Sequence, residues 1–189
     1  VTYVGELGWE LHVPASQAAG VYEALIRAGA DLNVADAGHY AINSLRLEKG
    51  YRAWGSDLTP DDTPLEAGLG FAIAWNKKAG FLGREALLRQ KGTILKRRLV
   101  LLVLRDPAAV LWGGEPVYRD GAAVGYTTSA GYGHTLGGAI AFAWVAREPD
   151  VPDDFLSSGD FAVSVAGDRV PATVHLKPPY DPSRSRILS

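Results

Sequence analysis

The sequence predicts an α+β protein, and three observations support that class. Helical patterns and apolar, strand-like runs alternate over the first half of the chain. From about residue 96 the pattern changes to short strand-like runs separated by glycine, aspartate and proline, with almost no helical periodicity. The strand–helix–strand repeats are too few for a doubly wound parallel sheet. We therefore place a boundary near Gly92, with one domain over residues 1–92 and a second over residues 96–189.

The chain opens on a predicted strand with a carboxylate in it. In "YVGELGWELHV" (3–13) apolar and polar residues alternate, so that Trp9, Leu11 and Val13 face one way and Glu10 and His12 the other. Two interpretations of Glu10 follow. It lies on the solvated side of a half-exposed strand, or it is a carboxylate held on a strand to bind a ligand.

Three helices and a second strand are expected in the rest of the first domain. A helix runs to Gly29 from a cap at Ser16, and a second covers about residues 37–49 with Asp36 as its cap. "GLGFAIAW" (68–75) is typical of a buried strand, and "GREALLRQK" (83–91) of a short helix.

The second half predicts a small barrel or sandwich. Its candidate strands are "RRLVLLVL", "EPVYRDG", "AAVGYTTS", "GAIAFAWVA", "DFAVSVAG" and "DRVPATVHLK". "VAGDRV" (165–170) carries the glycine and aspartate of a tight hairpin. Five or six short strands with turns between them are typical of these two architectures.

Composition excludes several classes of protein. The 21 acidic and 19 basic residues are spread along the chain, which offers no basic surface for nucleic acid or an anionic membrane. The absence of cysteine removes disulfides, thiolate nucleophiles and iron–sulfur ligation. It also permits a reducing compartment, and we expect the cytoplasm, or the mitochondrial matrix in a eukaryote. The longest apolar runs are far shorter than the roughly 20 residues of a membrane-spanning helix.

The first residues predict a piece of a longer protein. No signal peptide pattern is present, the chain has no methionine, and "VTYVGE" resembles the middle of a strand. We expect an internal or C-terminal part of a larger polypeptide.

Common cofactor and catalytic motifs are not found. The sequence has no G-x-G-x-x-G, no P-loop and no nucleophile elbow. The four histidines form no metal-binding pattern, so no metal is expected, and His134 is interpreted as a turn or surface residue. The segment 45–73 is unusually rich in charged and aromatic residues. Taken alone, Arg46, Glu48 and Lys49 within it fit a solvated helix face with intrahelical ion pairs.

Several of these segments together resemble one protein family. "YVGELGWELHVP", "GHYAINSLRLEKGYRAWGSDLTPDDTPLEAGLGFAI" and "FLGREAL" resemble the later part of the folate-binding domain of the glycine cleavage T-protein (aminomethyltransferase) family. "GEPVYRDGAAVGYTTSAGYGHTLGGAIAFAWV" resembles its C-terminal barrel. Within the family, "LRLEKGYRAWG", "TSAGYGHTLG" and "PPYDP" are most similar to the folate-binding region of dimethylglycine and sarcosine dehydrogenases or oxidases.

The resemblance implies a fold and a function. Residues 1–92 would form the later half of a ferredoxin-like folate-binding domain, with an antiparallel sheet and helices on one face, and residues 96–189 a Greek-key barrel. The chain would bind tetrahydrofolate as the one-carbon-transfer part of an FAD-dependent enzyme that demethylates an N-methylated glycine. FAD would bind an N-terminal domain upstream. The isolated fragment is expected to be inactive and to self-associate through the face left by the missing part.

The resemblance also implies site residues. A Tyr and a Glu seven residues apart at the family's pterin pocket correspond to Tyr3 and Glu10. A carboxylate with two acceptor oxygens suits the adjacent ring N–H and amine of a pterin, with bonds of about 1.5–3 kcal/mol each. Family members carry an arginine for the folate glutamate tail where this chain has Ile42, so Arg46 and Arg52 become the candidates. The catalytic aspartate would lie upstream, leaving no catalytic residue in this chain.

Three alternatives remain open at this stage. A free-standing aminomethyltransferase would share the pocket and act with a lipoyl carrier protein. A demethylase of another methyl donor would combine the same fold with a different upstream site. A non-catalytic binding or scaffold relative would keep a vestigial pocket; Ile42 favours it, whereas Tyr3 and Glu10 oppose it.

Overall fold

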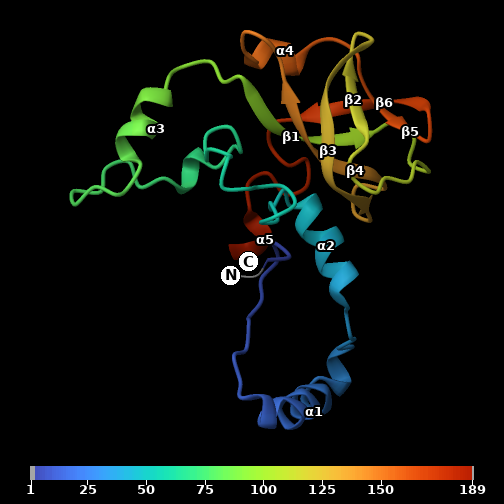
Figure 1. Ribbon diagram of the computed structural model, residues 1–189. Helices are drawn as coiled ribbons and strands as arrows, with labels where there is room; N and C mark the ends of the chain where they lie inside the picture. The colour runs from blue at the N-terminus through green and yellow to red at the C-terminus, as the bar shows by residue number, and fades with distance from the viewer. Residues whose placement is uncertain (1–2, 189) are drawn as a thin grey trace.

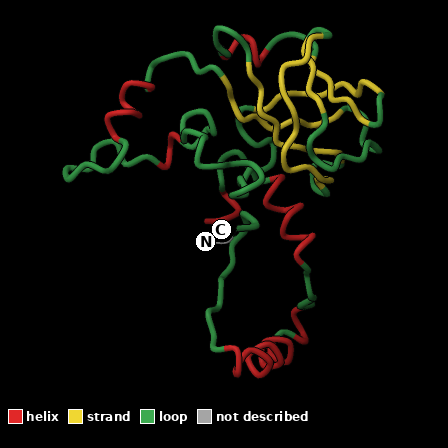
Figure 2. Tube along the Cα trace, viewed as in Figure 1, coloured by secondary structure: helices red, strands yellow, loops and turns green. Residues whose placement is uncertain are grey.

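The computed structural model describes residues 3–188 and confirms the α+β class (Figure 1). Val1, Thr2 and Ser189, which the predicted domains include, lie outside the described residues. The second half of the chain forms a β-barrel, and the first half forms helices and long connecting segments beside it (Figures 1 and 2). The boundary near Gly92 stays a prediction.

Six antiparallel strands close the barrel within the described residues. Their order is β1-β4-β3-β2-β5-β6. Because β2, β3 and β4 follow one another by hairpins while β1 lies beside β4, this is the Greek key that the resemblance implied. The strands are β1 (Arg97–Leu104), β2 (Pro116–Arg119), β3 (Ala122–Gly133), β4 (Gly138–Ala146), β5 (Phe161–Val165) and β6 (Asp168–His175).

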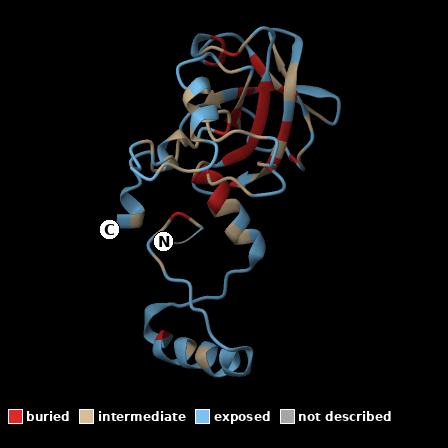
Figure 3. Cartoon of the chain, turned by 60° about the vertical axis from the view of Figure 1, so that its left-hand side comes forward, coloured by how far each residue is buried: buried red, intermediate tan, exposed pale blue. Residues whose placement is uncertain are grey.

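Strands β1 and β4 are buried on both faces, which explains their uninterrupted apolar sequences. Alternate residues such as Leu102 and Ala141 point into the barrel core. Those between them, including Leu99 and Phe142, pack outside the barrel against Leu47 of the first half. The buried residues therefore concentrate on the barrel and on the helix end that touches it (Figure 3).

The hairpin between β5 and β6 confirms the predicted tight turn. Val165 pairs with Asp168, so the loop consists of Ala166 and Gly167. Both have positive φ, 50° and 98°, as a type I′ turn requires. The turn is thus made by Ala-Gly, one position before the Gly-Asp pair that suggested it.

Three helices form in the first half where periodicity predicts them. They are α1 (Ala18–Ala28), α2 (His39–Glu48) and α3 (Arg84–Gln90); two short helices, α4 (Asp153–Ser157) and α5 (Ser185–Leu188), follow in the second half. The predicted caps are wrong. The cap positions are Gln17 and Gly38, and Asp36 instead accepts a hydrogen bond from the Tyr22 hydroxyl at 2.9 Å.

The two strands predicted in the first half are absent from the described residues. Residues 3–13 form a turn followed by extended coil, and residues 68–75 contain a 3-10 helix, Gly70–Ala72. Among the described residues no backbone hydrogen bond joins residues 8–13 to another segment, and Trp9 is 80% exposed. A strand is stable only when a neighbouring strand pairs with it. The ferredoxin-like sheet is therefore not formed in this part of the chain.

Helix α1 lies far from the barrel. It sits at the end of an open loop formed by the segments before α1 and between α1 and α2 (Figure 1). Its apolar side chains Tyr22 and Leu25 are each 50% exposed. Over residues 3–188, no helix has the length and apolar character needed to cross a membrane.

Candidate functional site

Three charged residues at the C-terminal end of α2 and its cap are buried. Arg46, Glu48 and Lys49 are 3%, 0% and 3% exposed, so the predicted solvated face is wrong. Each side chain has partners from a different segment. Glu48, for example, accepts hydrogen bonds at 2.8 Å from the backbone N–H groups of Thr135 and Leu136 in the β3–β4 turn. The charges therefore fasten the helix end to its surroundings.

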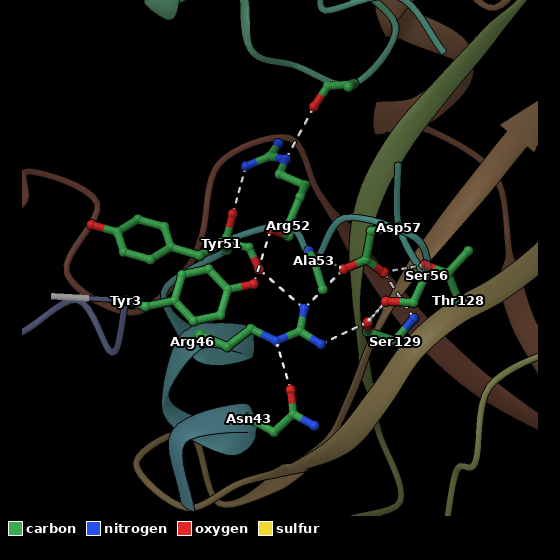
Figure 4. Close-up of polar contacts among 12 residues, drawn as sticks. Tyr3, Asn43, Arg46, Tyr51, Arg52, Ala53, Ser56, Asp57, Thr128 and Ser129 are labelled. Carbon is green, nitrogen blue, oxygen red and sulfur yellow. Dashed lines mark hydrogen bonds and ion pairs between the residues drawn. The ribbon is translucent and has the colours of Figure 1, made fainter. Parts of the chain in front are cut away.

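Arg46 is the centre of a buried polar cluster (Figure 4). Its Nη1 lies 2.8 Å from Asp57 Oδ2 and also donates to the Tyr51 carbonyl at 3.0 Å. Its Nε donates to Asn43 Oδ1 at 3.1 Å, and its Nη2 donates to Ser129 Oγ at 2.7 Å. Four hydrogen bonds thus satisfy most of the guanidinium, which has five N–H groups.

Asp57 is equally well satisfied. The N–H groups of Ala53 and Ser129 donate to its carboxylate at 2.8 and 2.9 Å, and the Thr128 hydroxyl donates at 2.5 Å. Trp144 of β4 donates its indole N–H to the Asp57 carbonyl at 3.1 Å. Because Thr128 and Ser129 lie on β3 and Trp144 lies on β4, the Arg46–Asp57 pair joins α2 and the following loop to the barrel.

Tyr3 lies beside this cluster. Its hydroxyl donates to the Arg52 carbonyl at 2.9 Å, and its ring centroid is 6.1 Å from that of Tyr51 at an interplanar angle of 30°. Partial burial raises the pKa of Tyr3, while the positive charge of Arg46 opposes that rise. The side chain remains 41% exposed, so the aromatic pair borders on solvent.

Arg52 points toward the barrel. Its Nε and Nη1 donate to the carbonyls of Ala67 and Gly50 at 3.0 and 2.5 Å, and its guanidinium lies 5.2 Å from the centre of the Phe142 ring. Burial lowers the pKa of its guanidinium below the usual value. Arg52 is partly buried, whereas Arg46 is fully buried.

Glu10 lies outside this cluster. Its side chain is 62% exposed, and its Oε2 is 4.0 Å from His12 Nε2 on the extended segment before α1. The structure therefore brings Tyr3, Arg46 and Arg52 together and leaves Glu10 apart from them.

Sequence reasoning missed the partners that organise the site. Asp57 lies in the charge-rich segment 45–73 but was not singled out, and Ser129 was only part of a predicted strand. One signal in the sequence could have found the pair. Arg46 lies in the last turn of a predicted helix, and Asp57 follows it in a loop that contains glycine, a pattern that suits a buried ion pair. No cluster of metal-binding side chains occurs in the described part of the chain.

Sequence comparison places both halves in one family. Residues 1–77 match the GCVT N-terminal domain, and residues 97–181 match the glycine cleavage T-protein C-terminal barrel domain. The chain belongs to the glycine cleavage T-protein family. Domains of this family bind tetrahydrofolate.

Relatives of this T-protein family chain include several larger oxidoreductases. It is 44% identical to mitochondrial sarcosine dehydrogenase of Mus musculus and 40% identical to mitochondrial dimethylglycine dehydrogenase of Rattus norvegicus, in each case over 99% of this chain. It is 46% identical to 4-methylaminobutanoate oxidase (formaldehyde-forming) of Paenarthrobacter nicotinovorans, again over 99% of this chain. The chain spans only 20%, 22% and 22% of these relatives, respectively.

A solved structure supports the same family fold. The crystal structure of glycine cleavage system aminomethyltransferase T from Bartonella henselae superposes with a TM-score of 0.76 at 31% identity. The match covers 92% of this chain and 46% of that one.

Proposed function

We propose that this chain is the tetrahydrofolate-binding, one-carbon-transfer part of an FAD-dependent oxidoreductase that demethylates an N-methylated glycine. The observation that carries the proposal is the similarity to sarcosine and dimethylglycine dehydrogenases along nearly the whole chain. The proposed substrate is a small molecule, and FAD would bind a part of the parent polypeptide outside this chain. The proposed compartment is the cytoplasm or the mitochondrial matrix.

Tyr3, Tyr51 and Glu10 are the residues proposed to hold the pterin. The tilted Tyr3–Tyr51 pair offers an apolar, partly exposed surface suited to one edge of a flat ring. Glu10 has an exposed carboxylate, which can accept hydrogen bonds from two adjacent N–H groups of a pterin. Because Glu10 and Tyr3 are not in contact here, the extended segment 8–13 would have to approach the ring when folate binds.

Arg52 is proposed to contact the glutamate tail in preference to Arg46. The Arg46 guanidinium is 3% exposed and already makes four hydrogen bonds, including the ion pair with Asp57. Withdrawing it to meet a ligand would leave Asp57 buried without its counter-charge. Arg52 is partly exposed and has no carboxylate partner at salt-bridge distance among the described residues.

Tetrahydrofolate, when bound, supplies the secondary amines that take up a one-carbon unit to give 5,10-methylenetetrahydrofolate. The residues of this chain would bind and orient it. No catalytic acid is proposed among them, in keeping with an active centre shared with the upstream part of the parent enzyme.

A free-standing aminomethyltransferase is the second candidate, favoured by the structural match to the Bartonella henselae protein. Both candidates share the folate pocket. The sequence upstream of residue 1 separates them, because an FAD-dependent parent requires a dinucleotide fingerprint between a strand and a helix there.

Replacing Glu10 by glutamine tests the folate assignment. In the intact polypeptide containing residues 1–189, Glu10→Gln is expected to weaken tetrahydrofolate binding by about tenfold or more, since a charge-assisted bond is lost. The yield of methylenetetrahydrofolate at limiting folate should fall with it. Glu23→Gln is the matched control, because Glu23 on α1 is similarly exposed at 65% and forms an ion pair with Arg27 at 3.7 Å. Unchanged binding by Glu10→Gln would indicate a vestigial pocket.

A further inference from the structure

The C-terminal segment of the chain holds the turn that carries Tyr3. The two ends of the described chain lie next to each other, with α5 beside the first residues (Figure 1). Leu7 donates its N–H to the Arg186 carbonyl at 3.1 Å, and Arg186 Nε lies 3.1 Å from Glu6 Oε2. Tyr180 donates its hydroxyl to the other carboxylate oxygen of Glu6. Three contacts therefore join residues 6–7 to residues 180–186.

The side chain of Lys49 packs against the same turn. A Cβ on Gly5, whose φ is 78°, would overlap the Lys49 side chain, so the backbone there lies directly on it. Lys49 Nζ forms an ion pair with Asp181, with side chains only 2% and 5% exposed. Asp181 also accepts a hydrogen bond from the backbone N–H of Ser185 at 2.9 Å, and this bond fixes the start of α5. The hydrogen bond from Lys49 lowers the pKa of Asp181 far below its usual value, so the Asp181 carboxyl is ionised at neutral pH.

We infer that Tyr180 and Asp181 are positioning residues that hold the Tyr3 turn in its ligand-binding conformation. We name residues 178–188 the C-terminal clasp. The turn needs such a device because residues 3–8 belong to no sheet or helix in the described chain. The hydrogen bond from Tyr3 to the Arg52 carbonyl and the ring contact with Tyr51 also join the start of the turn to the loop after α2.

The inference deepens the proposed function and rests on it, because it makes folate affinity depend on residues that do not touch the ligand. If the turn is in place for only a fraction of the time, the apparent dissociation constant rises by the reciprocal of that fraction. Loosening the clasp should therefore weaken folate binding without altering the bound complex.

Tyr180→Phe and Asp181→Asn in the intact polypeptide test the inference. Tyr180→Phe removes only the hydroxyl that donates to Glu6. Its matched control is Tyr22→Phe. This substitution likewise removes a hydroxyl that donates to a carboxylate, because Tyr22 on α1 donates to Asp36. The readouts are hydrogen exchange of the peptide covering residues 3–8, affinity for 5-formyltetrahydrofolate by calorimetry, and the midpoint of thermal unfolding.

Both clasp variants are expected to exchange faster over residues 3–8 and to bind 5-formyltetrahydrofolate about three- to tenfold more weakly, as loss of one or two hydrogen bonds predicts. Tyr180→Phe should lower the unfolding midpoint only slightly, because the barrel and its core are untouched. Tyr22→Phe should leave the exchange of residues 3–8 and the affinity for 5-formyltetrahydrofolate unchanged. If Asp181→Asn unfolds, Tyr180→Phe alone decides.

The outcomes separate the two proposals. Faster exchange with weakened binding supports the clasp. Binding by Tyr180→Phe equal to that of the unmodified polypeptide overturns the clasp and leaves the folate assignment intact. Failure of the unmodified polypeptide to bind any folate overturns the proposed function, and with it the positioning role.

Discussion

At the scale of single residues, the buried Arg46–Asp57 pair has a structural role. Each partner is removed from water, and every oxygen of the Asp57 carboxylate receives hydrogen bonds. A buried pair of this kind adds little net stability compared with a well-packed apolar pair, but losing one partner is costly because the other charge stays buried. The pair therefore specifies how α2 docks on the barrel.

Replacing Arg46 by methionine should lower the free energy of unfolding by about 3–5 kcal/mol. The cause is the uncompensated carboxylate of Asp57. Urea unfolding followed by circular dichroism measures the change. Arg27→Met, which removes an exposed pair with Glu23, is the control and should change stability by less than about 0.5 kcal/mol. An equal, small effect of both substitutions would contradict the structural role of Arg46.

Glu6 should make stability depend on pH in a defined direction. The hydrogen bond from Tyr180, with help from Arg186, lowers the pKa of Glu6 below 4.5. A carboxyl with a lowered folded-state pKa stabilises fully above its unfolded value, so this contribution is lost as the pH falls below about 4.5. The destabilisation caused by Glu6→Gln should thus be present at neutral pH and shrink in acid. A difference in unfolding free energy that is independent of pH would refute this assignment.

At the scale of elements, local pattern predicted what local interactions decide. The helices α1, α2 and α3 and the barrel strands form where periodicity and turn residues place them. The segments 3–13 and 68–75 also carry strand patterns, but a strand depends on a neighbour that sequence pattern does not reveal. In the described chain neither segment has that neighbour, so both are irregular.

The candidate site was predictable only in part. Tyr3, Arg46 and Arg52 were chosen from the resemblance, and the structure places them together. The burial of Arg46 was not predictable, because Arg46 meets its partner Ser129 from 83 positions away in the sequence. The ion pair of Lys49 with Asp181 spans 132 positions and lies equally beyond local reasoning.

Helix α2 should depend on one apolar anchor. Leu47 is 1% exposed and packs against the outer face of β1 and β4. Leu47→Ala is expected to cost about 2–5 kcal/mol, since it removes buried methyl groups and leaves a cavity. Tyr40→Ala on the same helix is the control, because Tyr40 is 90% exposed and its loss should stay within about 0.5 kcal/mol. Chemical unfolding of both variants gives the comparison, and comparable losses would mean that α2 is not anchored through Leu47.

At the scale of the whole molecule, the apolar surface is distributed unevenly. The segment before α1, α1 itself and the start of α2 expose large apolar side chains, whereas the barrel encloses most of its own. Contiguous exposed apolar surface favours association. The 189-residue chain by itself is therefore expected to self-associate.

Light scattering over a wide concentration range measures this association. Trp9→Ser combined with Leu11→Ser should reduce it, because both side chains are exposed on the extended segment. Val110→Ser on a barrel loop is the control and should have no effect. Monomeric behaviour of the unmodified chain at all concentrations would contradict the prediction.

The most direct test of the folate assignment is a crystal structure of the intact polypeptide with 5-formyltetrahydrofolate. We expect the pterin to lie against Tyr3 and Tyr51, with its ring N–H and amine donating to Glu10, and the glutamate tail to lie near Arg52. The clasp contacts of Glu6 with Tyr180 and Arg186 should be retained in that complex. A folate bound elsewhere on the molecule, or none at saturating concentration, would contradict it.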